Sequence, residues 1–230
     1  MDPIQIISLT LGAAWASGIN LYAAVLVLGY LGVTGDIFLP PELQILTNPL
    51  VLGAAALMYA IEFFADKIPG VDSGWDLVHT FIRIPAGAAL AAGMAQGLDI
   101  SQGAEFAALL VGGGIAAASH TAKTGTRMLI NTSPEPVSNW SASIAEDIAV
   151  VGGLWASLQY PWAFVIGLVL FLLLVAWLLP RIWGALKRTI RALGNLFKGR
   201  DNSGQEGLNA DHNKVDSLRA LYQDSAKKNR

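Results

Sequence analysis

Acidic residues lie in two close pairs within otherwise apolar stretches of this sequence. The pairs are Glu62 with Asp66 and Glu146 with Asp147. Positions 62 and 66 are four residues apart, so a helix would place both carboxylates on one face. Two carboxylates on one face favour a bound cation or a shared proton. Glu62 and Asp66 are therefore the best candidates for a metal site, although the sequence does not name the metal.

Two further sets of polar residues share one spacing, with members at relative positions 0, 3 and 7. The sets are Asp76, His79 and Arg83, and His120, Lys123 and Arg127. On a helix each set forms a single stripe. A stripe of this kind could carry protons on its histidines and bind an anionic group with Arg83 or Lys123.

We predict a substrate or ion site from these residues, because an ionisable group at membrane depth costs about 2.5–3.5 kcal/mol to insert. The expected site residues are Asn20, Glu62, Asp66, Asp76, His79, Arg83, His120, Lys123, Glu146 and Asp147. The alternative is a ring of charges that pair with one another and fix the topology. We favour that alternative for Lys67, Asp72 and Arg127. The sequence leaves the pairing open: Glu146 or Asp147 with Lys123 or Arg127, and Asp76 with Arg83 or Lys67.

Composition places these residues in a membrane protein. Hydrophobic residues make up 53% of the 230 residues and charged residues only 14%, whereas about a quarter of a soluble domain is charged. There is no cysteine, which excludes disulfides and thiolate metal sites. Apolar runs predict an all-α protein with six transmembrane helices in one domain, residues 1–180. The predicted spans are 5–32, 49–65, 76–96, 104–120, 141–158 and 161–180.

The placement of basic residues predicts the topology. The loop at 33–48 contains Asp36 and Glu42 but no Lys or Arg, whereas the loops near 66–75 and 121–140 contain Lys67, Lys123 and Arg127. The positive-inside rule then places both termini in the cytoplasm. Residues 181–200 are basic and amphipathic, which predicts an interfacial helix on anionic lipid headgroups; a plain topology anchor explains the same pattern. Residues 201–230 are predicted to be a polar cytoplasmic tail.

The first span contains a polar break at residues 17–20, Ser-Gly-Ile-Asn. Such a break can unwind a membrane helix and expose backbone carbonyls. Residues 13–20 are similar to 116–121, and 65–68 to 145–148, in the same order along the chain. A three-span unit repeated once must have inverted topology, so we expect a 3+3 inverted repeat; chance similarity among Ala-rich spans is the competing explanation.

The motif EFFADKIPGVDSGWDLVHTFIRIPAGA at 62–88, with SGINLYA at 17–23 and the polar series from Ser119 to Asp147, resembles a known family. This is the bacterial and plastid membrane-protein family called domain of unknown function 4126, and the resemblance covers about residues 5–180. It implies a multi-pass protein of the bacterial inner membrane. It also favours the motif residues as members of a functional site. The family has no established activity, so it implies no catalytic roles.

Together these features predict a small secondary transporter that moves a solute or ion with coupled protons or cations. A channel or lipid-translocating protein would use the same polar surface, and a non-transporting scaffold or assembly factor is the third possibility. We do not expect an enzyme, because HExxH and G-x-S-x-G signatures are absent. No cofactor and no nucleic-acid partner is expected. The expected partners are membrane lipids and a small solute or ion, with homo-oligomerisation left open.

Overall fold

The computed structural model describes residues 1–68, 70–130, 136–181 and 214. It divides the chain into two compact units, Met1–Leu178 and Leu179–Arg230. The described residues of the second unit are 179–181, which end a helix, and Lys214. The predicted interfacial helix at 181–200 and tail at 201–230 therefore lie outside the described residues, apart from Arg181 and Lys214.

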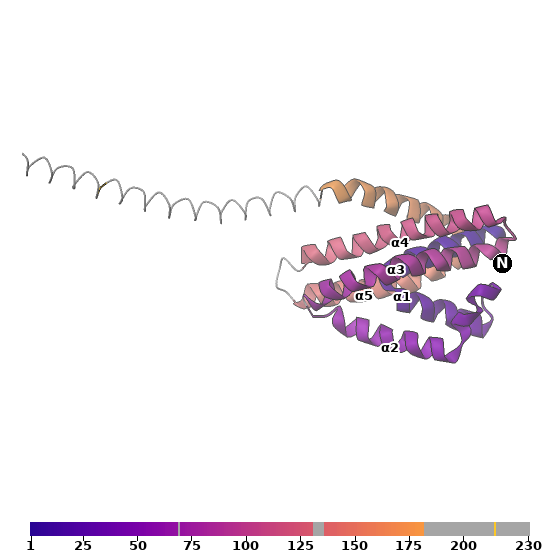
Figure 1. Ribbon diagram of the computed structural model, residues 1–230, viewed down its shortest axis with the longest axis horizontal. Coiled ribbons are helices and arrows are strands. Elements are labelled where there is room, and N and C mark those ends of the chain that lie inside the picture. Colours follow the sequence, from indigo (N-terminus) through magenta and orange to yellow (C-terminus); the bar gives the residue numbers. More distant parts are fainter. Residues whose placement is uncertain (69, 131–135, 182–213, 215–230) are drawn as a thin grey trace, which may run out of the picture. The chain divides into compact units, whose positions relative to one another are not determined.

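Helices make up most of the described part of the chain, which contains no strand. The helices are α1 (Pro3–Thr34), η1 (Pro41–Thr47), α2 (Pro49–Ala65), α3 (Val71–Ala95), η2 (Gln96–Leu98), α4 (Gln102–Ile130), α5 (Pro136–Gln159) and a last helix, Pro161–Arg181. Figure 1 shows α3 and α4 side by side, as their extensive contacts require. The prediction of an all-helical protein is confirmed.

The helices α4 and α5 are longer than the predicted spans. α4 continues to Ile130 and α5 begins at Pro136, so only residues 131–135 separate them. The prediction of a loop over 121–140 is therefore wrong, and Lys123 and Arg127 lie on a helix. Hydropathy ended the span at 120 because the following turns are polar, but their basic side chains face the protein interior.

Within the described residues, three helices are long and apolar enough to cross a membrane: Pro3–Thr34, Gly74–Leu98 and Pro161–Arg181. The pair η1 and α2, bent by 64° at their junction, raises the number to four if it counts as one span. The six predicted spans are thus not confirmed as a set. The reason lies in composition, because α4 and α5 carry many of the charged residues predicted for the site.

The helix α1 folds back on itself. A straight helix of 32 residues would be about 48 Å long. Yet Gln5 lines one cavity together with Leu31 and Asp36, and Ile6 lines another with Pro40. The N-terminus and the loop before η1 accordingly lie at the same end of the first unit (Figure 1). α1 therefore consists of two arms, each running between that end and a shared tip.

The tip of α1 is Asn20, within the break predicted at residues 17–20. Its backbone is extended, with φ −146° and ψ 98°, between two helical arms. Its side-chain oxygen accepts a hydrogen bond from the Ala23 backbone N–H at 3.0 Å. This is the geometry of an N-cap, which satisfies one of the backbone donors that a new helix leaves unpaired. Asn20 thus ends the first arm and begins the second.

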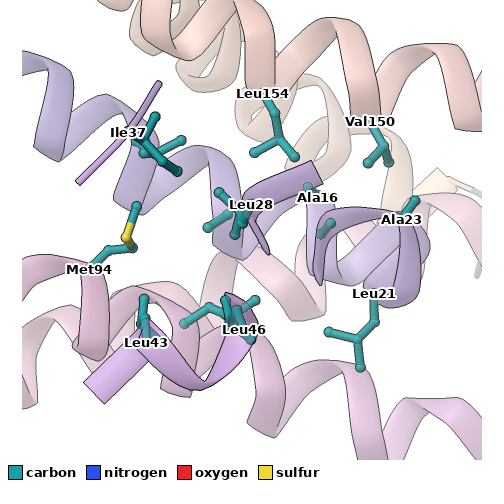
Figure 2. Packing of buried hydrophobic residues seen from close by; sticks show 14 of the residues in the cluster. Ala16, Leu21, Ala23, Leu28, Ile37, Leu43, Leu46, Met94, Val150 and Leu154 are labelled. Atoms are coloured by element: carbon teal, nitrogen blue, oxygen red, sulfur yellow. The ribbon is translucent and has the colours of Figure 1, made fainter. Parts of the chain in front are cut away.

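The two arms of α1 form the centre of the first unit, in contact with α2, α3, α4 and α5. Figure 2 shows Leu28 of the second arm near Ile37 and Met94, with Leu154 of α5 above them. Trp15 of the first arm packs edge-on against Phe164 and lies over Gly153, where a Cβ would overlap its ring. These contacts fix the position of the tip.

Candidate functional site

Seven ionisable side chains from four helices form one buried network beside the tip of α1. We call it the ion network; its members are Glu62, Asp66, Asp76, Arg83, Lys123, Arg127 and Glu146. Glu62, Asp76, Arg83 and Arg127 are 0% exposed. Arg83 lies 12 residues into α3, about 18 Å along the helix axis. The ion network therefore extends from the helix ends to about the middle of α3.

Arg83 joins α2 to α3. Its Nη2 donates to Glu62 Oε1 at 2.6 Å, and its Nη1 donates to Asp76 Oδ1 at 2.8 Å. The planar guanidinium suits two carboxylates at once, since its donors are fixed in a fork. Ser17 of α1 donates to the Arg83 carbonyl at 2.9 Å, which ties α1 to the same turn.

Lys123 lies at the centre of the ion network. Its Nζ is 3.0 Å from Asp66 Oδ2, 3.3 Å from Glu62 Oε1, and 3.5 Å from both Asp76 Oδ1 and Glu146 Oε2. These four carboxylates come from α2, from the residue that caps it, from α3 and from α5. A single ammonium on α4 thus holds together side chains from three other parts of the chain.

Arg127 closes the end of the ion network nearest the C-terminal end of α4. It forms a two-pronged pair with Glu146, through Nε to Oε1 at 3.0 Å and Nη2 to Oε2 at 2.8 Å. It also donates to the backbone carbonyls of Asp66 and Asn139. The sequence favours a role for Arg127 in a ring of paired interface charges, whereas the structure buries it beside the predicted site residues. Its 0, 3, 7 spacing from His120 was the signal that placed it on the same buried stripe.

Both predicted histidines lie at the edge of the ion network. His120 Nδ1 is 3.4 Å from Arg83 Nη1, and because a guanidinium only donates, this ring nitrogen must accept. Its Nε2 then donates to Thr80 Oγ1 at 2.7 Å, so His120 is neutral. His79 Nδ1 donates to the Trp75 carbonyl at 2.9 Å, and its Nε2 is 3.0 Å from the Tyr22 hydroxyl.

Asp147 belongs to a separate contact at the tip of α1. Asn20 Nδ2 donates to Asp147 Oδ1 at 3.1 Å, and Tyr59 of α2 hydrogen-bonds to the same carboxyl group. Glu146 and Asp147 point in different directions because adjacent helical residues are about 100° apart. The structure therefore divides this acidic pair: Glu146 enters the ion network and Asp147 secures the hairpin.

The structure brings together most of the predicted site and resolves its pairing. Asp76 pairs with Arg83 and Lys123, and Glu146 with Arg127 and Lys123. Lys67 instead donates to the Phe63 carbonyl and lies over the Phe63 ring. Residue type and spacing did not indicate Tyr22, Tyr59 or Thr80, because a lone hydroxyl has no sequence signature.

The candidate metal residues Glu62 and Asp66 both face Lys123. Among the described residues, no group of three or more His, Cys, Asp or Glu side chains is arranged to hold a metal ion. Three carboxylate oxygens of the ion network, Glu62 Oε2, Asp66 Oδ1 and Asp76 Oδ2, are buried without a hydrogen-bond partner. The arrangement can therefore bind protons or water at these atoms.

A cavity of about 750 Å³ lies away from the ion network, between the two arms of α1 and α5. Leu26, Val27 and Trp155 supply apolar lining, and Gln5 and Asp36 supply polar groups. The cavity lies beside the ends of the arms, whereas the ion network lies beside their tip. The two features are thus separated along the length of the hairpin.

Comparison with known proteins identifies the family. No curated protein and no solved structure matches the chain. A family model described as "Domain of unknown function (DUF4126)" matches residues 7–181. The match includes α2–α5, which carry the whole ion network, and the tip of α1 at Asn20. The chain is therefore a member of the DUF4126 family.

Proposed function

We propose that this protein is a small secondary transporter that moves a solute or ion coupled to protons or cations. One observation carries the proposal: seven ionisable side chains from four helices are buried together at the tip of a broken helix. Broken helices that end near the midplane build the binding sites of many secondary transporters, because their ends expose backbone groups. Buried ionisable groups in a membrane bundle mark such ion pathways.

The proposal includes a revised topology. The two arms of α1, with 17 and 14 residues on either side of Asn20, run from one end of the first unit to the tip and back to the same end. We infer that α1 is a re-entrant hairpin and that the other five long helices cross the membrane. The Pro3 end of α1 then lies opposite the cytoplasm with the acidic 35–48 loop, and the C-terminal end remains cytoplasmic.

The inverted repeat stays a prediction. The two segments we compared meet in the structure, since Gly18 lies against Ser119 and Ala116. Only the first of them is broken, because α4 continues through residues 116–121 without interruption. If the two halves of the protein arose as a repeat, one half must have lost or gained the break in its first helix.

The pairing within the ion network favours a second candidate function. Every cation of the network contacts at least two carboxylates, so the network could serve mainly to fasten four helices together. Under that explanation the protein is a non-transporting scaffold or assembly factor. In the transport proposal the same pairs hold the site closed toward the cytoplasm and must part when it opens.

A flux assay in proteoliposomes separates these functions. Vesicles loaded with a pH-sensitive dye are challenged with inorganic cations, inorganic anions and small carboxylates, one at a time. We expect proton movement that depends on one solute class in the wild type. Glu62→Gln and Arg83→Ala should reduce it to the rate of empty vesicles, because each removes a member of the ion network. No solute-dependent proton movement in the wild type would favour the scaffold.

The matched control for this assay is Glu42→Gln. Glu42 is an exposed acid in η1, outside the ion network. Its substitution should leave the flux at the wild-type rate. Flux that persists unchanged in both network variants would remove the ion network from the transport mechanism.

A further inference from the structure

The ion network carries more negative than positive groups. Its four carboxylates are Glu62, Asp66, Asp76 and Glu146, and its three cations are Arg83, Lys123 and Arg127. With all seven ionised, the network has a net charge of −1. His120 does not offset this charge, since its hydrogen bonds make it neutral.

The neighbouring charges do not restore balance. Lys67 adds one positive charge and Asp147 adds one negative charge, so together they leave the total unchanged. The other titratable groups that face the network are Tyr22 of α1, Tyr59 of α2 and His79 of α3, and none of them needs to be charged in its observed hydrogen bonds. Among the described residues, the excess therefore stays negative. An uncompensated buried charge is strongly unfavourable in a folded protein.

The positions of the carboxylate oxygens show where a balancing proton fits. Glu62 uses only Oε1 for both Arg83 and Lys123, which leaves Oε2 without a partner. Asp76 likewise uses only Oδ1 and leaves Oδ2. Asp66 Oδ1 is also without a hydrogen-bond partner. Both carboxylate oxygens of Glu146, in contrast, accept hydrogen bonds from Arg127. An ammonium has three hydrogens, so Lys123 cannot hold all four carboxylates at once.

We propose that the ion network holds one exchangeable proton, shared by the carboxyl groups of Glu62, Asp66 and Asp76, and that this proton is the coupling ion of the transporter. The inference rests on the proposed function for its role, but the proton itself follows from the charges and contacts. A metal cation fits less well than a proton, because the Lys123 ammonium lies where the four carboxylates converge and would repel it.

Sharing among the three carboxyl groups gives the proposal a specific consequence. The proton binds one carboxylate oxygen, and its loss to water returns the network to the −1 state without any other change in bonding. Substituting any one of the three acids with its amide equalises the charges at three and three. The amide variants Glu62→Gln, Asp66→Asn and Asp76→Asn should therefore each remove the need for the proton.

Infrared spectroscopy of the full chain in lipid nanodiscs tests the proposal. At pH 7 the wild type should show a protonated-carboxyl C=O stretch that shifts in D₂O. Each of the three amide variants should lose this band, and Glu42→Gln should keep it. Absence of the band in the wild type would overturn the proposal, and so would its persistence in all three variants. Loss in one variant alone would contradict sharing.

The infrared result is independent of the flux assay. A band with the expected losses but no solute-dependent flux would refute transport while leaving the proton site in place. Flux without a band would support transport and show that its coupling ion is not this proton. The wild-type spectrum decides the presence of the proton even where a variant does not fold.

Discussion

Replacing Arg83 with methionine is expected to destabilise the protein by about 3–5 kcal/mol, because removal of one partner leaves buried charges without compensation. Arg83 is the only cation that contacts Glu62 and Asp76 at less than 3 Å in the described residues. Without it, four carboxylates would face two cations. Unfolding by denaturant in detergent micelles, followed by tryptophan fluorescence, measures the loss.

The control for Arg83→Met is the triple variant that also carries Glu62→Gln and Asp76→Asn. This variant has two cations and two carboxylates left in the ion network, so it should recover most of the lost stability. Wild-type stability in Arg83→Met would show that the ion pairs contribute little. No recovery in the triple variant would assign the loss to the packing of the arginine stem rather than to charge.

Replacing Gly18 with alanine should cost about 3 kcal/mol, near the upper end for overpacking in a close-packed interior. A Cβ on Gly18 would overlap both Ser119 Oγ and the carbonyl oxygen of Ala116 on α4. The serine could rotate away, but the carbonyl belongs to a helix and cannot. The first arm of α1 would therefore have to move, and the tip at Asn20 would move with it.

The matched control for Gly18→Ala is Gly53→Ala on α2. Nothing lies within 4 Å of a Cβ built on Gly53. Alanine is favoured over glycine in a helix by about 0.5–1 kcal/mol, so this variant should be as stable as the wild type or slightly more stable. The same denaturant titration compares them. Equal stabilities for both variants would mean that α1 and α4 do not approach closely at Gly18.

The sequence predicted the helices and the shared face of the polar residues well, because both depend on local periodicity. The predicted span 49–65 coincides with α2, and 161–180 differs from the last helix by one residue. The 0, 3, 7 spacing indicated that the stripes of α3 and α4 could each face one partner, and they face each other through Asp76–Lys123 and Arg83–His120.

The direction of the second arm of α1 could not be predicted from the sequence. The break at residues 17–20 was recognised from its polar residues, but its angle depends on the backbone of Asn20 alone. A small kink would give a crossing helix, whereas a sharp turn gives a hairpin. The apolar composition of both arms is the same in either case, so hydropathy does not distinguish them.

The partners of the charged residues also could not be predicted from the sequence. Spacing shows which residues share a face, but the partner across a helix interface depends on how the helices rotate and slide. Lys123 and Arg127 looked like loop residues because a charged turn lowers hydropathy. Their burial becomes understandable only when four carboxylates from other elements surround them.

The hairpin in α1 is the central claim, since it places Asn20 beside the ion network and, in the proposed topology, puts the Pro3 end opposite the cytoplasm. The chain has no cysteine, so single cysteines can be introduced without further changes. Asp2→Cys, Glu42→Cys and Ile68→Cys place a thiol before α1, in η1 and after α2, where all three side chains are exposed. A membrane-impermeant maleimide applied to right-side-out and inverted vesicles then reports the side of each position.

The hairpin predicts that positions 2 and 42 react from the same side of the membrane and that position 68 reacts from the other. A helix that crosses the membrane once would place position 2 with position 68 instead. Labelling of positions 2 and 68 from the same side, with position 42 opposite, would contradict the hairpin and restore a topology with both termini in the cytoplasm.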